Sequence, residues 1–230
     1  MSGWENMLSL IQEAGIIPFF SNPLRGWSVE EHTPLHFWFT DEQLGPWDWK
    51  IECVRSGDIA YGKYLWGGKA SFARADVYRE LVNWRRSLPK YAPTAEQQKV
   101  LDYVEEHGSV SVPEVRALLG LKKAAADALL ARLQMQTRLV TGDIERVYRG
   151  PDLRYSGWQR CSFCTPDALF FDAPDFPFPG FAGAAAADLS SGGSFKSALT
   201  PAQSLEFLKE TIRKASRTDV PEALWGKMLG

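Results

Sequence analysis

Apolar residues recur at helical spacing in three short stretches near the middle of the chain, and each stretch carries its own start and stop signals. The first begins at Thr94 and is ended by Gly108. Its apolar positions are Val100, Leu101 and Val104. Thr94 and Gln97 form the capping-box pattern, in which each side chain satisfies a free backbone N–H group. The spacing and the cap predict a helix.

The second stretch is shorter and is marked by the same kind of cap. Ser111 is followed three residues later by Glu114, and Pro113 lies in the first turn, where its missing N–H group costs nothing. Gly120 closes the stretch. This pattern predicts a short middle helix.

The third stretch predicts a helix from Lys122 to about Gln134 with two distinct sides. The core side is apolar and consists of Ala126, Leu129, Leu130 and Leu133. The other side is small or polar and consists of Lys123, Asp127, Ala131 and Gln134. That second side suits close approach to a nucleic-acid groove, except at Asp127, which a phosphate would repel.

Two segments rich in Leu, Val, Ile, Thr and Tyr follow, and they predict a β-hairpin. They span 137–149 and 155–163, with a turn signal at 149–152 between them. Gly142 and Asp143 break the alternation, which predicts a bulge there. Three helices followed by a hairpin is the order of the winged helix-turn-helix, so we assign residues 93–172 to that fold.

The flanking segments predict a further α+β region and a C-terminal arm. Residues 1–92 contain a helix over 3–14, a short strand, a hairpin turning at Gly67 and Gly68, and a helix that starts at Ala73 or Arg74 and runs to about Arg86. After a short helix over 165–170, residues 173–200 are too rich in Pro, Gly, Ala and Ser to build a core. The last segment, residues 201–230, starts with a helix that Thr200 and Gln203 cap. The expected fold class is α+β.

Composition limits the function classes. The chain has 230 residues, 45% of them hydrophobic, and its formal net charge is −2. No basic leader or long apolar run is present, so we expect a cytoplasmic protein without a membrane segment. The three cysteines lack the spacing of a zinc site, so we expect neither a metal nor a cofactor.

The distribution of charge suggests a phosphate-binding surface. Basic residues exceed acidic ones by five over 61–92 and by four over 122–160. Solvated surface is the commoner explanation for such residues, and the alternative is contact with phosphate. The residues that we predict to bind nucleic acid are Lys63, Lys69, Lys122, Lys123, Arg138, Arg146, Arg149 and Arg154.

Aromatic residues crowd into the segment 37–66, where they either fill a core or line a pocket for a flat ligand. Charged residues interleave with them, and these are costly to bury without partners. The predicted pocket residues are His32, Trp47, Trp49, Lys50 and Tyr61.

Several strings between residues 15 and 172 resemble the AlkZ-related family, which is named for kinship with winged-helix DNA glycosylases of the AlkZ and YcaQ type. The strings are GWSVEEHTP at 26–34, GPWDWK at 45–50, AYGK at 60–63, LQMQT at 133–137 and TPDALF at 165–170. The resemblance implies tandem winged helices and a glycosylase. Those enzymes carry a Gln-x-Gln pair early in the chain; Gln134 and Gln136 have that spacing but lie further on.

Chemistry adds two carboxylates to the catalytic candidates. A cationic alkylated base needs little acid assistance to leave, so an amide or a carboxylate that positions water could suffice. The candidates are Glu31, Asp48, Gln134 and Gln136. Capping and helix termini give Glu31 and Gln134 structural explanations as well.

The sequence thus favours a winged-helix protein that binds double-stranded DNA and acts on alkylated DNA, at most by hydrolysing an N-glycosidic bond. The alternative is a module that binds a protein or a small ligand and uses the winged helix for packing, for example in a homodimer.

Overall fold

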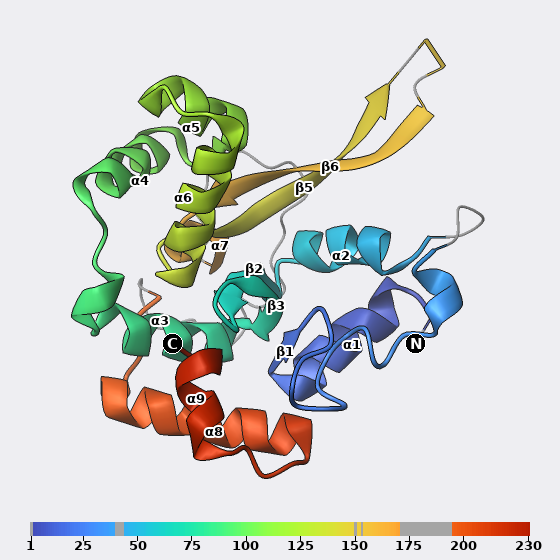
Figure 1. Ribbon diagram of the computed structural model, residues 1–230, viewed down its shortest axis with the longest axis vertical. Coiled ribbons are helices and arrows are strands. Elements are labelled where there is room, and N and C mark those ends of the chain that lie inside the picture. Colours follow the sequence, from blue (N-terminus) through green and yellow to red (C-terminus); the bar gives the residue numbers. More distant parts are fainter. Residues whose placement is uncertain (1, 40–43, 150, 153, 171–194) are drawn as a thin grey trace.

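The computed structural model describes residues 2–39, 44–149, 151–152, 154–170 and 195–230. It is an α+β structure with two three-stranded antiparallel sheets, ordered β1-β3-β2 and β4-β6-β5. Helices lie around both sheets, and the β5–β6 hairpin projects from the upper right of the molecule (Figure 1). Within the described residues, no helix is both long and apolar enough to span a bilayer.

The first sheet is built by the N-terminal half of the chain. Its elements are α1 (Trp4–Ala14), β1 (Ile16–Pro18), β2 (Ile59–Leu65), β3 (Lys69–Arg74) and α3 (Ala75–Arg86). The predicted hairpin at Gly67 and Gly68 is confirmed, and these glycines adopt φ values of 70° and 101°. Such positive angles favour glycine because it has no Cβ. The predicted helices 3–14 and 73–86 are confirmed as α1 and α3.

The helix α2 (Pro46–Arg55) has no counterpart among the predicted elements. Its buried residues are Pro46, Trp49, Lys50, Ile51, Cys53 and Val54. Spacings of three and four residues place all of them but Ile51 on one side of the helix, and Ile51 widens this side, because α2 packs against both α1 and β5. A short 3₁₀ helix (Leu35–Phe37) precedes it.

The middle of the chain follows the predicted boundaries closely. Its elements are α4 (Ala95–His107), β4 (Val110–Ser111), α5 (Val112–Leu119) and α6 (Lys123–Met135), with a 3₁₀ turn (Pro89–Tyr91) before them. Both predicted capping boxes are present, at Thr94 with Gln97 and at Ser111 with Glu114. The strand β4 was not predicted because it has only two residues and depends on pairing with β6.

The predicted hairpin is confirmed as β5 (Val140–Arg149) and β6 (Arg154–Cys164). The register shifts between Thr141 and Asp143, which confirms the predicted bulge at Gly142. A second shift lies between Arg146 and Tyr148. Bulges bend and twist a hairpin, which explains how its outer part leaves the body of the protein.

The C-terminal segment packs on α3 (Figure 1). It contains α7 (Pro166–Phe170), α8 (Pro201–Ser216) and α9 (Glu222–Met228). The predicted cap at Thr200 and Gln203 is confirmed, whereas α9 was not predicted. Most of the predicted arm, from 173 to 194, lies outside the described residues. In residues 195–230, which the structure describes, the hydroxyls of Ser197 and Ser204 donate hydrogen bonds to the buried carboxylate of Glu80.

Two main hydrophobic cores result. The smaller core lies among α4, α5 and α6, and the larger one joins the first sheet to α1, α3, α8 and α9. Val140, Cys164 and Leu169, from the base of the hairpin and from α7, belong to the larger core. A third cluster of Ile51, Val54 and Ile144 links α2 to β5. The hairpin is therefore packed against both halves of the chain.

Candidate functional site

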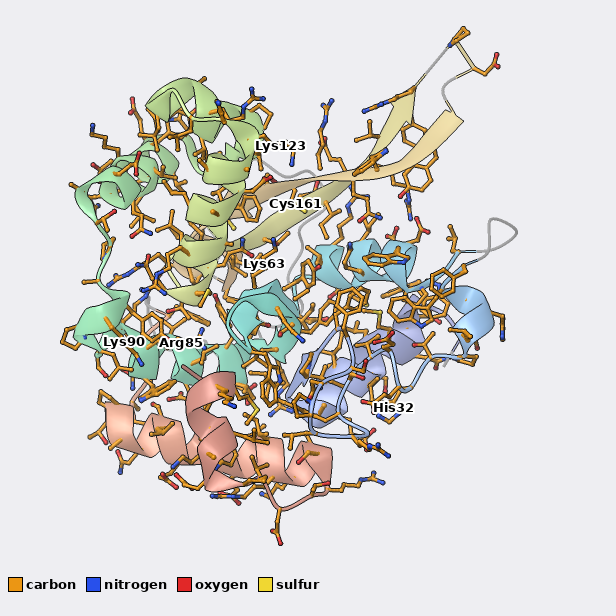
Figure 2. All side chains as sticks on the ribbon, viewed as in Figure 1. His32, Lys63, Arg85, Lys90, Lys123 and Cys161 are labelled. Carbon is orange, nitrogen blue, oxygen red and sulfur yellow. The ribbon has the colours of Figure 1, made fainter. Side chains whose placement is uncertain are left out.

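A cleft of about 620 Å³ lies between α6, β2, the start of α5 and the β5–β6 sheet. Its basic residues come from four elements and are Lys63, Arg116, Lys123 and Arg160; its acidic residues are Asp127 and Glu145. Its apolar residues include Tyr61, Leu130 and Phe163. Figure 2 shows the labelled Lys123, Cys161 and Lys63 following one another along this region. The cleft therefore combines apolar walls with a surplus of positive charge.

The polar side of α6 faces this cleft only in part. Lys123 pairs with Asp127 at 2.7 Å, so the carboxylate that would repel phosphate is compensated within the helix. At the other end of the stripe, the Oε1 atom of Gln134 accepts the backbone N–H of Lys63 at 3.0 Å. Its Nε2 group donates to the carbonyl of Leu130. Gln134 thus ties α6 to β2.

Gln136 is directed to a different part of the molecule. Its Nε2 group donates to the Ala92 carbonyl at 3.2 Å and to Oε1 of Gln97 at 3.1 Å. Both Gln134 and Gln136 are buried, and their hydrogen-bond partners lie in different segments of the chain. The structure does not bring the two glutamines together at one site.

Asp48 and Arg146 are brought together, although their sequence positions differ by 98. The Arg146 guanidinium donates to Asp48 at 3.0 Å and lies 3.6 Å from Glu52. Because two carboxylates of α2 neutralise it, Arg146 fastens the hairpin to α2 instead of offering a free cation. The same ion pair occupies the Asp48 carboxylate.

The outer part of the hairpin carries exposed aromatic and basic residues. Tyr148 is 53% exposed and Trp158 is 67% exposed, and Arg149 and Arg160 are also exposed. Arg149 is the register partner of Arg154. The exposed rings were missed as site residues because tyrosine and tryptophan in a strand predict β-structure as readily as binding. The neighbouring residues in the sequence do not indicate that these rings lie on a projecting hairpin.

The aromatic crowd contains a buried lysine. The Lys50 ammonium lies 5.2 Å from the Trp47 ring centre, 5.7 Å from that of Tyr61 and 6.0 Å from that of Phe19. It makes no hydrogen bond to a described residue and is 6% exposed. Burial lowers the pKa of Lys50, while the nearby Cys161 and Asp48 act in the opposite direction. Contact with the faces of three rings stabilises the cation in place of water.

Other rings of the crowd fill the larger core. Trp38, Trp49 and Tyr64 are buried, and Trp49 packs against Phe37 with ring centres 5.1 Å apart. Trp47 is partly exposed, and Tyr61 lines the cleft. The segment therefore contributes mainly core, with Tyr61 at its boundary with the cleft.

His32 lies in a loop that is separated from the labelled cleft residues Lys63 and Lys123 (Figure 2), and Glu31 precedes it in the same loop. The Glu31 carboxylate accepts the backbone N–H of Gly26 at 2.9 Å and the Ser28 hydroxyl at 2.7 Å. The His32 Nε2 atom lies 3.0 Å from the Gly26 carbonyl oxygen. The contacts of a capping box form here, but the residues make turns instead of a helix. Both side chains organise the loop.

The remaining predicted phosphate contacts occupy different surfaces. Lys122 is exposed at the start of α6, and Lys69 is exposed at the start of β3. Arg138 is half-buried, and burial lowers its pKa. In the part of the chain that the structure describes, no three His, Cys, Asp or Glu side chains gather as a metal site would require.

Replacing Lys50 with methionine is expected to increase stability at neutral pH. The folded protein has a lowered Lys50 pKa, so between that value and the ordinary value of 10.5 the unfolded chain binds more protons. The free energy of unfolding of the wild type therefore rises with pH between these two values. Below the lowered pKa, the cost of burying the charged Lys50 side chain does not change with pH. Urea unfolding at several pH values should show a gain for Lys50→Met that shrinks toward pH 10.5. A gain that grows with pH would contradict the assignment.

These features define an α+β protein with a basic cleft between its two sheets and a hairpin that projects beside it. The chain matches the model of the family described as AlkZ related over residues 1–224, and it belongs to that family. No curated protein and no solved structure matches the chain.

Proposed function

We propose that this protein binds DNA through two winged-helix units arranged in tandem. The supporting observation for the architecture is a repeated topology. The segment α1-β1-α2-β2-β3 runs helix, strand, helix and then hairpin, and the segment α4-β4-α5-α6-β5-β6 follows the same order with two helices before its hairpin. In both sheets the first strand pairs with the third and the third with the second. The 3₁₀ helix Leu35–Phe37 corresponds in order to α5.

The observation that carries the DNA-binding proposal is the joint surface of α6 and the β5–β6 hairpin. Lys122 and Lys123 lie at the start of α6, and Arg149 and Arg160 lie on the hairpin. In winged-helix proteins the last helix and the wing are the elements that approach the double helix. Positive charge supplies most of the affinity for a phosphate backbone, and exposed rings can stack on bases.

The proposal concerns binding and does not extend to catalysis. The four catalytic candidates from the sequence occupy separate positions, namely a loop, an ion pair at the hairpin and two core contacts. Incubation with DNA containing an alkylated purine, followed by alkali to cleave abasic sites, tests directly whether the protein acts on alkylated DNA.

Binding to a labelled 21-base-pair duplex, measured by fluorescence anisotropy over a range of salt concentrations, tests the proposal. Arg149→Ala should reduce the slope of log affinity against log salt concentration by about one unit, which corresponds to the loss of one phosphate contact.

Lys99→Ala is the matched control, because Lys99 is an exposed cation on α4. It should leave both the affinity and the salt dependence unchanged. Absence of binding, or binding that does not respond to salt, would contradict the proposal and favour a protein-interaction role.

A further inference from the structure

The position of α6 limits how it can meet a double helix. A helix that reads base pairs enters a major groove about 12 Å wide and needs free space along its exposed side. In this protein the C-terminal part of the polar stripe is buried, because Gln134 bonds to the backbone of Lys63 on β2. Met135 also packs near Gly68 of the β2–β3 turn. On the polar stripe of α6, only the first turns therefore remain available to a partner.

The space beside α6 is the cleft, and its volume suits a smaller object than a duplex. About 620 Å³ lies within the range of roughly 300–1,000 Å³ that is typical of sites for small ligands. Its walls come from α5, α6, β2, β5 and β6, so a duplex cannot pass through it. One unpaired nucleotide, or two, can be accommodated in a space of this size.

The chemistry of the walls fits the two halves of a nucleotide. Tyr61, Leu130 and Phe163 offer apolar surface to a base, and the Ser162 hydroxyl can hydrogen-bond to it. Lys63, Arg116 and Arg160 bring positive charge toward a phosphate.

The acidic groups of the cleft oppose this charge only in part. Asp127 is paired with Lys123, and Glu145 lies opposite Arg160 in the register of the hairpin. The charge balance of the lining residues remains positive, which disfavours a cationic ligand.

We infer that this cleft holds an unpaired nucleotide of a DNA strand, while the hairpin contacts the flanking duplex. The inference rests on the proposed DNA-binding function and specifies its substrate class as DNA with a locally unpaired strand. The hairpin also carries the exposed rings of Tyr148 and Trp158, on which further unpaired bases can stack. Stacking on such rings is tolerant of base sequence, so the preference should depend on pairing and little on sequence.

The test compares a 21-base-pair duplex with the same duplex carrying a central bubble of three unpaired positions. The full-length wild type should bind the bubble about 10 times more tightly, since one or two contacts of about 1–3 kcal/mol each are added. Lys63→Ala combined with Arg160→Ala should bring this ratio close to one. Arg149→Ala should weaken binding to both DNAs alike, and Lys99→Ala should leave both unchanged.

The outcomes separate this inference from the proposed function. Equal affinity of the wild type for both DNAs, or an unchanged ratio in the Lys63 and Arg160 variant, would overturn the inference while the DNA-binding function stands. No binding to either DNA would instead reject the proposed function. Thymidine monophosphate is added at the concentration at which bubble DNA saturates the protein. If it displaces the bubble DNA at that concentration, the cleft is a site for a free nucleotide, and the inference is overturned. Thermal unfolding of each variant verifies that the fold is retained.

Discussion

Replacement of Arg85 with methionine is expected to lower the free energy of unfolding by about 2–5 kcal/mol, because buried carbonyl groups lose a charged donor. Arg85 is 2% exposed and donates to the carbonyl oxygens of Leu229 and Met135. Its guanidinium lies 5.3 Å from the centre of the Tyr91 ring. Burial lowers the pKa of Arg85 to about 10, so the side chain stays charged at neutral pH. Urea unfolding measures the effect.

A double-mutant cycle identifies the source of that loss. Deletion of residues 225–230 removes Leu229, the carbonyl that accepts two of the Arg85 hydrogen bonds. The effect of Arg85→Met should therefore be smaller in the truncated chain than in the full one. Equal effects in the two backgrounds would show that Arg85 does not hold the C-terminal segment. Arg25→Met, at an exposed arginine, should change stability by less than about 0.5 kcal/mol.

Replacement of Trp27 with alanine is expected to cost about 3–5 kcal/mol, as for other large buried aromatic side chains. Trp27 is fully buried, and its indole N–H donates to the Ile16 carbonyl at 2.9 Å. The surrounding segment 20–34 consists of turns without a regular helix or strand. Trp27 therefore anchors this loop to the core, in addition to the hydrogen bonds that the loop makes through its backbone and through Glu31.

Two comparison variants separate the contributions of Trp27. Trp27→Phe keeps most of the ring volume but loses the indole hydrogen bond, so it should cost less than the alanine variant. Trp158→Ala removes an equal volume from a side chain that is 67% exposed, and it should be nearly neutral for stability. A loss of more than 2 kcal/mol for Trp158→Ala would show that the hairpin packs more closely than the structure indicates.

The elements that could be predicted are those specified by neighbouring residues. Capping boxes at Thr94, Ser111 and Thr200 each act within four residues, and the paired glycines at 67 and 68 act within a turn. The bulge at Gly142 was visible because it interrupts a local alternation. Residues 93–172 follow the predicted order of elements, although the domain boundaries themselves remain predictions.

The elements and contacts that could not be predicted depend on distant partners. The helix α2 has only ten residues, has no side-chain cap at Gly45 and carries the charged Lys50 on its buried side, so its start signal and its apolar pattern are both weak. The pair of Arg146 with Asp48 and the bond of Gln134 to Lys63 join positions 98 and 71 residues apart. Each of these contacts changes the role of a predicted site residue. The cleft likewise exists only because β2 and α6 meet.

The sharing of core residues between the two halves has a practical consequence for anyone who dissects the protein. Val140, Cys164 and Leu169 are covered by side chains from the first half and the C-terminal helices. A fragment cut from 93 to 172 would keep its own three-helix core but would expose this second apolar surface to water. Such a fragment is expected to self-associate, so a failure of the isolated piece to engage nucleic acid would carry no weight against the intact chain.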